Sequence, residues 1–249
     1  MEIEILKKQF SALSKRADGG NVFYYSDFLT LSEQSELMKL KLPNAALFGG
    51  YELAERKLAR FGLPEEFGYE EPLPIVCLKI EPRDEKFSAS PSHRDYLGAV
   101  MNLGIERDTV GDIVVLPEGA FLFALSRIAL FILENLSRAG RSALSVSVVE
   151  ALPAALSPKL EKIRVNVASE RADAVVAAIF RMPRARASAL FDAGRVFIGG
   201  EELLNGSKPL KDGTSVSVRG FGKFIYDGID GTSRKGRLFV EASLYKDPK

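Results

Sequence analysis

The sequence is poor in the residues from which metal sites and disulfides are built. Its 249 residues include one cysteine, Cys77, one histidine, His93, and no tryptophan. A lone cysteine excludes an intramolecular disulfide framework and a cysteine-based zinc site, and a lone histidine leaves a His-ligated centre short of ligands. We therefore expect neither a metal nor a cofactor.

Long hydrophobic runs are also missing. The longest candidate, Ile128–Leu133, is flanked by Arg127 and Glu134 and falls far short of the roughly 18 apolar residues that span a bilayer. The N-terminus, MEIEILKKQF, lacks the apolar stretch of a signal peptide. We expect a soluble, cytoplasmic protein without a membrane partner, whose hydrophobic share of 46% is enough to build cores.

An excess of charge of one sign is absent as well. The chain has 34 Lys and Arg against 33 Asp and Glu, whereas generic nucleic-acid binders carry a large positive excess. The charges are nevertheless segregated: residues 171–249 hold 14 basic and 9 acidic side chains, a net of +5, and residues 1–170 a net of −4. This asymmetry indicates that the C-terminal part meets a polyanion, although chance solvation of the surface explains it equally well on its own.

The first 70 residues have the pattern of a small helical domain. Apolar residues at Ile3, Leu6, Phe10 and Leu13 line one helical face. Thr30-Leu31-Ser32-Glu33 is a capping box that begins a second helix, which ends near Leu42. A third helix is expected over residues 51–61, followed by a linker at residues 68–74.

The middle of the chain alternates between strand and helix patterns. Strands are expected over residues 75–80, 113–116, 120–124 and 143–149, with helices over residues 92–103 and 126–139. The order β-α-β-β-α-β is that of a ferredoxin-like unit, a topology that also houses RRM-type RNA binders. Phe121 and Phe123 share one parity on a central strand, so they form either an RNA-stacking platform or part of the core, and we favour the core.

The remainder begins with a strand at residues 160–168, which either extends the middle sheet or joins the next domain. Two short helices follow at residues 172–180 and 184–193, then strands at residues 196–198, 215–219 and 237–244. The fold class is therefore α+β with three domains: a helical N-terminal domain (1–70), a ferredoxin-like, RRM-like middle domain (71–168) and a C-terminal α+β domain (169–249).

The C-terminal residues resemble the S4 RNA-binding domain. The family pattern of Arg-Leu-Asp, two short helices and Gly-x-Val is matched by Arg171-Ala172-Asp173, Pro183-Arg184 and Gly194-Arg195-Val196, and its basic loop and turn by residues 207–209 and 212–214. Three positions depart from it, namely Ala172 for Leu, Pro183 for Ser and Gly199 for Asn. The resemblance implies an S4-like RNA-binding domain, and the three departures affect only turn geometry and one helix cap.

Two sequence segments upstream of this domain indicate a more specific family. FGGYELAERK (Phe48–Lys57) and HRDYLGAVMNLGIERDTVGDIVV (His93–Val115) are similar to blocks of the bacterial YlmH-type S4-domain proteins, in the same order and at the same spacing. The resemblance implies a factor of the translation machinery that binds structured rRNA and tRNA on the large ribosomal subunit. It also implies a part in the rescue of stalled subunits that carry peptidyl-tRNA. We expect a monomer that does not bind DNA.

The residues expected to contact RNA are mostly arginines, because the planar guanidinium donates two hydrogen bonds to a phosphate and stacks on bases. On the first S4-like helix, the side opposite the apolar residues carries two arginines and two small alanines, Arg171, Ala174, Ala178 and Arg181. The expected RNA-binding residues are Arg171, Arg181, Arg184, Arg186, Ser188, Arg195, Lys208, Arg219 and Lys223.

Residues His93, Arg94 and Tyr96 allow two interpretations. They form a second patch that contacts RNA or the ribosome, or they are only the start of a helix. His93-Arg94-Asp95 is similar to a kinase catalytic loop, but Val100 stands where that loop has Asn and no Gly-rich phosphate loop accompanies it.

No other motif supports catalysis. Gly220-Phe221-Gly222 is too short for a dinucleotide fingerprint, and no G-x-S-x-G accompanies the single histidine. We expect a non-catalytic protein. The alternatives are an RNA-modifying enzyme that uses the S4-like domain for substrate binding, and a protein-interaction scaffold that uses the acidic N-terminal domain.

Overall fold

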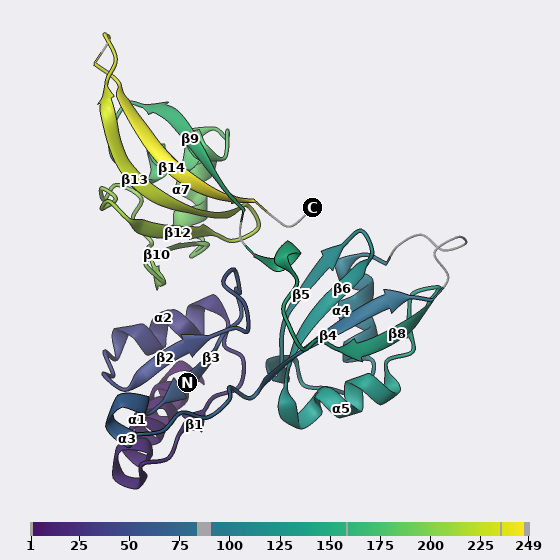
Figure 1. Ribbon diagram of the computed structural model, residues 1–249. Coiled ribbons are helices and arrows are strands. Elements are labelled where there is room, and N and C mark those ends of the chain that lie inside the picture. Colours follow the sequence, from purple (N-terminus) through teal and green to yellow (C-terminus); the bar gives the residue numbers. More distant parts are fainter. Residues whose placement is uncertain (1, 84–90, 158, 235, 247–249) are drawn as a thin grey trace. The chain divides into compact units, whose positions relative to one another are not determined.

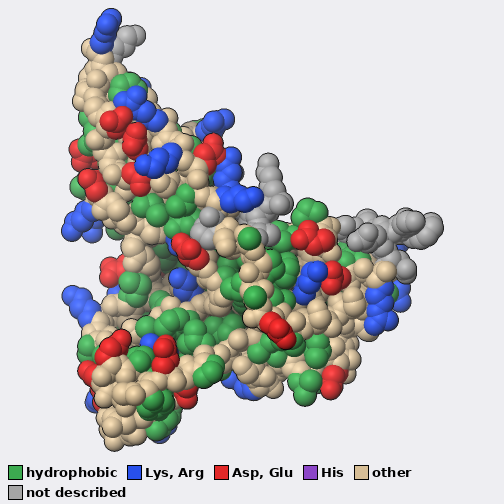
Figure 2. Space-filling view, in the orientation of Figure 1, with side chains coloured by type: hydrophobic (Ala, Val, Ile, Leu, Met, Phe, Trp, Pro, Cys, Tyr) green, Lys and Arg blue, Asp and Glu red, His purple; other side chains and the backbone are tan. Residues whose placement is uncertain are grey.

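The computed structural model describes residues 2–83, 91–157, 159–234 and 236–246. The chain forms two compact units, residues 1–157 and residues 158–247 (Figure 1). Within the described ranges, no helix combines the length and the apolar character needed to cross a membrane. Figure 2 shows basic and acidic side chains interspersed on the visible face of the C-terminal unit.

The N-terminal part of the first unit is a small α/β layer. Its elements are α1 (Glu2–Gly20), β1 (Tyr24–Tyr25), α2 (Leu31–Lys39), β2 (Ala45–Phe48), β3 (Leu58–Phe61) and α3 (Pro64–Phe67). The strands form an antiparallel sheet in the order β1-β3-β2. Phe10 and Ala17 of α1 pack with Leu37 of α2 and Phe61 of β3. The predicted capping box is confirmed, because Thr30 and Glu33 bond each other's backbone N–H.

The prediction of a third helix over residues 51–61 is wrong, and so is the prediction that the N-terminal domain is purely helical. The backbone N–H groups of Glu55 and Arg56 donate to the Asp112 carboxylate at 2.7 and 3.1 Å, in place of helical carbonyls. All four residues of β3 are buried, which requires both faces of the strand to be covered. Tertiary partners thus override a local pattern that was compatible with a helix.

The middle part of the first unit has the ferredoxin-like element order that the sequence predicts. Its elements are β4 (Ile75–Pro82), α4 (His93–Met101), η1 (Arg107–Thr109), β5 (Val110–Leu116), β6 (Gly119–Leu125), α5 (Ser126–Asn135), β7 (Arg138–Ala139), β8 (Ser142–Val148) and η2 (Ala154–Leu156). The antiparallel sheet runs β5-β6-β4-β8-β7. Helices α4 and α5 cover one face, where Tyr96, Val100 and Ile132 pack on Leu78 and Leu122.

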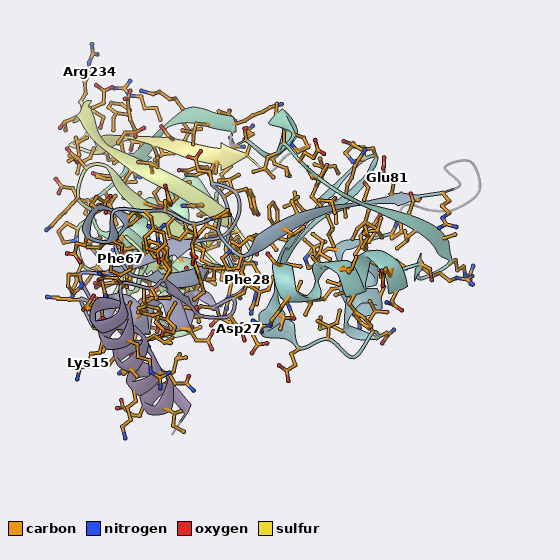
Figure 3. The ribbon with its side chains drawn as sticks, turned by 60° about the horizontal axis from the view of Figure 1, so that its bottom comes forward. Lys15, Asp27, Phe28, Phe67, Glu81 and Arg234 are labelled. Carbon is orange, nitrogen blue, oxygen red and sulfur yellow. The ribbon has the colours of Figure 1, made fainter. Side chains whose placement is uncertain are left out.

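The other face of this sheet is covered by the N-terminal part. Phe121 and Phe123 are 2% and 1% exposed and pack with Phe28, which Figure 3 labels where the two parts meet. The Tyr51 ring stacks on Phe123 with centroids 4.7 Å apart. A Cβ on Gly111 would lie 2.8 Å from the Phe28 ring, so this close approach needs glycine. The prediction that these phenylalanines belong to the core is confirmed.

The C-terminal unit packs two helices on one long sheet. Its elements are β9 (Lys159–Val167), α6 (Ala172–Ile179), α7 (Arg184–Asp192), β10 (Val196–Ile198), β11 (Glu201–Glu202), β12 (Thr214–Val218), β13 (Gly222–Thr232) and β14 (Leu238–Lys246). The sheet order is β11-β10-β12-β13-β14-β9. Because β9 pairs with β14 along its whole length, it belongs to this unit, which begins at residue 158 and not at 169. A division of the first unit near residue 70 remains a prediction.

Candidate nucleic-acid interface

A buried carboxylate organises the start of α6. Asp173 is 4% exposed and accepts hydrogen bonds from Arg171 Nε and Nη2 at 3.1 and 2.8 Å. Arg184, at the start of α7, donates from Nη2 to the same two carboxylate oxygens at 3.1 and 3.3 Å. Two arginines that lie 13 positions apart in the sequence are thereby held side by side.

The loop after β11 completes this arrangement. The N–H groups of Ala172 and Asp173 donate to the carbonyls of Lys208 and Gly206, both at 2.9 Å, so the loop satisfies two donors of the first helical turn. A Cβ on Gly206 would lie 2.8 Å from Asp173 Cβ and 3.0 Å from the Phe191 ring, which leaves room only for glycine. The loop brings exposed Lys208 next to Arg171, and we call Arg171, Asp173, Arg184 and Lys208 the Asp173 cluster.

The charge state of this cluster follows from its contacts. Burial raises the pKa of the Asp173 carboxyl, but the hydrogen bonds and charges of Arg171 and Arg184 outweigh burial and bring the pKa below its ordinary value. The pKa of Arg171 is raised, chiefly by its hydrogen bond to Asp173. With one carboxylate against three cations, the cluster keeps a net charge of +2 at neutral pH.

The geometry of the cluster suits an anion. The side chains of Arg171 and Arg184 remain 44% and 49% exposed while Asp173 fixes their inner edges. A guanidinium has five N–H donors, so each arginine keeps donors that face solvent in an orientation set in advance. Such a pair can bind phosphate oxygens with little further loss of side-chain freedom.

A second group of cations surrounds the turn between β12 and β13. The Arg186 guanidinium lies over the Phe221 ring at 5.2 Å, and Arg195 Nη2 donates to the Arg219 carbonyl at 2.8 Å. The Arg219 N–H in turn donates to the Arg195 carbonyl at 2.9 Å. We call Arg186, Arg195, Arg219 and Phe221 the turn cluster. It presents guanidinium groups beside an aromatic ring, a combination that suits phosphates and stacked bases.

The other predicted residues lie apart from these clusters or contribute little exposed surface. Lys223 places its ammonium 5.1 Å from the centre of the Tyr245 ring on the neighbouring strand β14. Ser188 is half-buried on α7. Neither residue belongs to the Asp173 cluster or to the turn cluster, and an RNA-binding role for them remains a prediction.

The prediction that Arg171, Ala174, Ala178 and Arg181 form one open side of α6 is wrong. Every residue of α6 except Ala178 is buried, and Ala174 is 9% exposed, so no open strip joins Arg171 to Arg181. Arg181 lies past the other end of the helix in the left-handed region (φ 50°), where it lines a groove with Arg164 and Lys246. This backbone conformation favours glycine, so an arginine there strains the chain.

The prediction that His93, Arg94 and Tyr96 form a second RNA-contacting patch needs correction. Tyr96 is 1% exposed and belongs to the core beneath α4, and this burial excludes it as an RNA contact. Ser92 and Asp95 form a capping box, so the segment is the start of a helix. His93 and Arg94 are exposed on its first turn.

One residue that organises these sites, Asp173, is not identified as a site residue by the sequence. Asp173 was noted only as part of a motif, although an acid two residues after Arg171 is within reach of that arginine once a helix begins between them. Phe221 belongs to a segment, residues 219–224, whose interleaved basic and aromatic residues predict either an RNA contact through phosphates and stacking or a plain hairpin. Its pairing with Arg186 depends on the packing of α7 against that turn.

Known proteins provide independent evidence of relationship. Residues 73–152 match the family described as a putative RNA-binding domain in YlmH. The chain is 31% identical over 200 residues to the ribosome-associated protein quality control protein P2 of Bacillus subtilis (strain 168), which covers 78% of this chain and 76% of that protein. A solved structure, the cell division protein ylmH from Streptococcus pneumoniae, aligns with 60% of this chain and 92% of its own, with a TM-score of 0.46 and 20% identity. The match to the Bacillus subtilis protein, at 31% identity over more than three quarters of both chains, and the match of residues 73–152 to the YlmH domain together show that this chain belongs to the YlmH family.

Proposed function

We propose that this protein is a non-catalytic RNA-binding factor that associates with ribosomes. The observation that carries the proposal is the Asp173 cluster, in which one buried carboxylate orients two half-exposed arginines at the starts of two helices. A purely structural ion pair would not need a second arginine and a neighbouring lysine that all keep exposed donors. The name of the Bacillus subtilis relative supports the ribosomal setting.

The C-terminal unit is the proposed S4-like RNA-binding domain. Its two short helices are followed by strands, in the order that the resemblance implies. The loop at residues 205–208 is docked on the first helix, which supports the proposal. The proposed target is structured rRNA and tRNA on the large subunit. Phosphate and shape contacts suffice for structured RNA, whereas base reading by a sheet needs open aromatic platforms, and Phe121 and Phe123 are covered.

The proposed biological role is quality control in the cytoplasm, on stalled large subunits that still carry peptidyl-tRNA. In this role the protein binds as a monomer, needs no cofactor and contacts neither DNA nor a membrane. The relative's printed name, with its reference to ribosome-associated quality control, is the support for this finer assignment.

Sedimentation of a cell lysate through a sucrose gradient tests the proposal. We expect the wild-type chain to migrate with large subunits, and Arg171→Gln/Arg184→Gln to shift toward the top of the gradient. Migration of the wild type as free protein would contradict it. Nucleoside mass spectrometry of RNA incubated with the protein distinguishes a non-catalytic binder from the alternative, because a changed nucleoside would reveal an RNA-modifying enzyme.

A further inference from the structure

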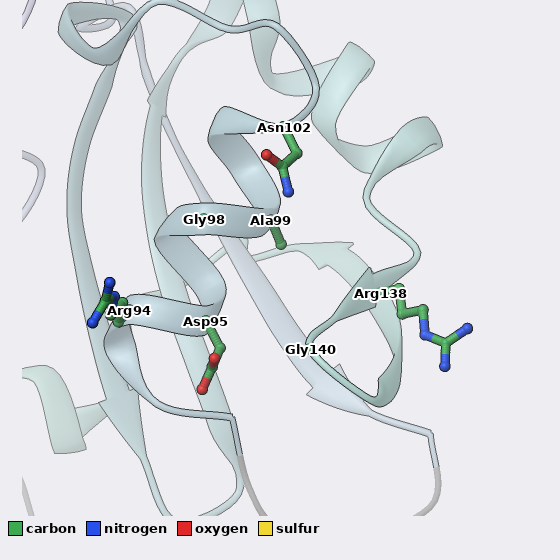
Figure 4. A pocket seen from close by; sticks show the side chains of 7 residues that line it. All are labelled: Arg94, Asp95, Gly98, Ala99, Asn102, Arg138 and Gly140. Atoms are coloured by element: carbon green, nitrogen blue, oxygen red, sulfur yellow. The ribbon is translucent and has the colours of Figure 1, made fainter.

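The groove at the end of α6 combines apolar and basic side chains, unlike the groove beside α4. In the groove beside α4, Figure 4 shows the Arg94 and Arg138 side chains pointing away, so these cations do not face a ligand there. The groove at the end of α6 lies within the C-terminal unit, over β9 and β14. Its lining includes half-buried apolar residues and exposed cations, namely Ile163, Ala178 and Leu244 with Arg164, Arg181 and Lys246.

Strand β9 borders this groove and is an outermost strand of its sheet (Figure 1). It pairs with β14 over nine positions on one side. Among the strands that the structure describes, none pairs with its other side. Every second residue of an edge strand directs its N–H and C=O outward, so β9 presents a row of hydrogen-bond donors and acceptors. Another extended chain could satisfy both kinds of group.

The exposed side chains of β9 are mainly basic. Lys159, Lys162 and Arg164 are exposed on this strand, and Glu161 is its one acid. The carboxylate of Glu161 is paired with Lys246 on the neighbouring strand. In the described part of the chain, the Lys162 ammonium has no ionic partner. The edge of the sheet therefore carries positive charge that an acidic strand would neutralise.

Arg181 lines the groove at a backbone position that favours glycine. Its φ is 50°, and the N–H of the next residue, Met182, donates to the Ala177 carbonyl at 2.9 Å, which is the usual arrangement of a glycine after a helix. The Arg181 side chain is exposed, and its guanidinium forms no ion pair with the residues that the structure describes. An arginine that strains the backbone without a contact inside the fold is explained by a contact outside it.

The edge of β9 suits an acidic peptide better than a phosphate backbone. Phosphate oxygens only accept hydrogen bonds, so they leave the outward carbonyls of β9 without a donor, whereas a peptide strand supplies donors and acceptors. Phosphates also gain nothing from the apolar lining of the groove. Two acids, Glu161 and Asp230, lie among the cations and repel a continuous row of phosphates.

A second copy of this chain is a poorer partner than an acidic strand. Antiparallel pairing of two β9 strands about Ile163 would place Lys162 opposite Arg164 of the other copy. Like charges directly opposite each other destabilise a strand pair, and charged edges commonly protect proteins from self-association. The same charges attract a strand of opposite charge.

We propose that β9 and the groove at the end of α6 form a docking site for a protein partner, which adds an extended segment of alternating acidic and apolar residues beside β9. The acidic side chains of the segment lie opposite Lys162 and Arg164, which share one face of the strand. The apolar side chains between them lie on the other face, where Ile163 and Leu244 line the groove. This site is separate from the RNA-binding function proposed above.

The test is binding of the full-length chain to a fluorescent peptide of alternating glutamate and valine, as long as the nine residues of β9. Fluorescence anisotropy measures the affinity. Lys162→Glu is expected to weaken binding by about tenfold, because it turns a cross-strand attraction into a repulsion. The matched control is Lys211→Glu, which makes the same charge change at an exposed position of the same unit outside β9 and the groove, and it should bind like the wild type.

N-methylated peptides separate strand addition from attraction between charges. One form carries methyl groups on the glutamate amides and the other on the valine amides, so each form loses the donors of one edge while its charge is unchanged. At least one form is expected to bind about tenfold more weakly than the parent peptide, because the main-chain hydrogen bonds are lost. If both forms bind like the parent, no strand is added and the proposal is overturned.

Arg181→Gly separates a binding role of this arginine from a structural one. Glycine relieves the left-handed backbone, so the Tm is expected to rise, while the affinity for the peptide falls about threefold. A lower Tm with unchanged peptide affinity would show that Arg181 serves the fold, and it would contradict the part assigned to this residue.

The remaining outcomes distinguish the three partners. We expect Lys162→Glu to bind a structured RNA hairpin like the wild type. If the hairpin displaces the peptide and Lys162→Glu binds the hairpin about tenfold more weakly, β9 contacts RNA and the docking proposal is overturned. If the wild type sediments as a dimer that the peptide dissociates, the edge pairs with a second copy, which also overturns it. Peptide affinity of Lys162→Glu equal to that of the wild type would do the same.

Discussion

At the scale of single residues, Asp173 is the part of the RNA-binding face whose removal is most informative. It is an acid in a site proposed to bind a polyanion, so charge alone predicts that its removal strengthens RNA binding. Its hydrogen bonds to Arg171 and Arg184 predict the reverse, because they fix the direction of both guanidinium groups. The two arguments, from charge and from the positioning of the arginines, therefore predict changes of opposite sign in RNA affinity.

We expect Asp173→Asn to weaken binding of the full-length chain to structured RNA by about 1 kcal/mol, although the net charge rises by one. Fluorescence anisotropy measures the change. Asp192→Asn is the matched control, because Asp192 is exposed on the same unit and its loss alters charge without releasing the arginines. Tighter binding by Asp173→Asn than by the control would show that Asp173 does not position the cluster.

The same carboxylate predicts a pH dependence of stability. Because the folded-state pKa of Asp173 lies below its ordinary value, its contribution to stability is complete above the unfolded-state pKa of about 3.9 and is lost as the pH falls through the folded-state pKa. The difference in Tm between the wild type and Asp173→Asn should therefore be constant from about pH 5 to 8 and shrink in more acidic buffer. Thermal melts followed by circular dichroism measure it, and a difference that grows on acidification would be inconsistent.

At the scale of elements, the face of β4 and β6 that lies under the N-terminal part holds the single thiol. Cys77 is 7% exposed, and burial raises its pKa to about 12, so native protein presents almost no reactive thiolate at neutral pH. Tyr51 covers the same face through its stack on Phe123. Labelling of Cys77 therefore reports the opening of this contact.

We expect Tyr51→Ala to accelerate maleimide labelling of Cys77 by about tenfold at pH 7, as loss of a stacked ring costs roughly 1 kcal/mol or more. Mass spectrometry measures the labelling rate. Tyr69→Ala removes an aromatic ring that contacts Phe23 and Phe67 within the N-terminal part, so it serves as the control and should leave the rate near that of the wild type. Equal rates in all three proteins would mean that the stack does not hold the two parts together.

The position of β9 sets the boundary of the C-terminal unit. It pairs with β14 over nine positions, and its residues Ile163, Val165 and Val167 pack on the core of this unit. A fragment of residues 158–249 should therefore fold cooperatively, whereas residues 169–249 lose an edge strand and expose β14. Urea unfolding followed by circular dichroism compares them, and equal stability of the two fragments would place β9 outside the folding unit.

The sequence predicted elements best where the signal was local. The Thr30–Glu33 capping box is as expected from its spacing. The helix expected over residues 184–193 is α7, and its buried residues Ala187, Leu190 and Phe191 follow one another at spacings of three and one. The helix expected over residues 51–61 failed because Asp112, more than 50 residues away, accepts its backbone N–H groups. Strand β13 was missed, since Gly222, Gly228 and Gly231 interrupt the strand pattern that its partners β12 and β14 enforce.

The candidate site shows the same limit. Residue types and positions identified the arginines, but helical periodicity grouped Arg171 with Arg181, whereas the structure groups Arg171 with Arg184 through Asp173. Periodicity assumes that one side of a helix is open, and α6 is covered on nearly all sides by α7, the sheet and the loop at residues 205–208. Contacts of this kind cannot be read from spacing along one helix.

At the scale of the whole molecule, the charge segregation follows the two compact units. Residues 158–247 carry 16 basic and 11 acidic side chains, a net of +5, and the rest of the chain has a net of −4. The acidic first unit should disfavour indiscriminate binding of RNA, so that affinity depends on the oriented arginines of the second unit.

The salt dependence of RNA binding by Arg171→Gln/Arg184→Gln, measured beside the wild type with the same structured RNA, tests the role of the Asp173 cluster most directly. Each phosphate contact contributes about one to the slope of log affinity against log salt, so we expect the double variant to bind more weakly and its slope to be flatter by about 2. An affinity and a slope equal to those of the wild type would contradict RNA binding by the Asp173 cluster.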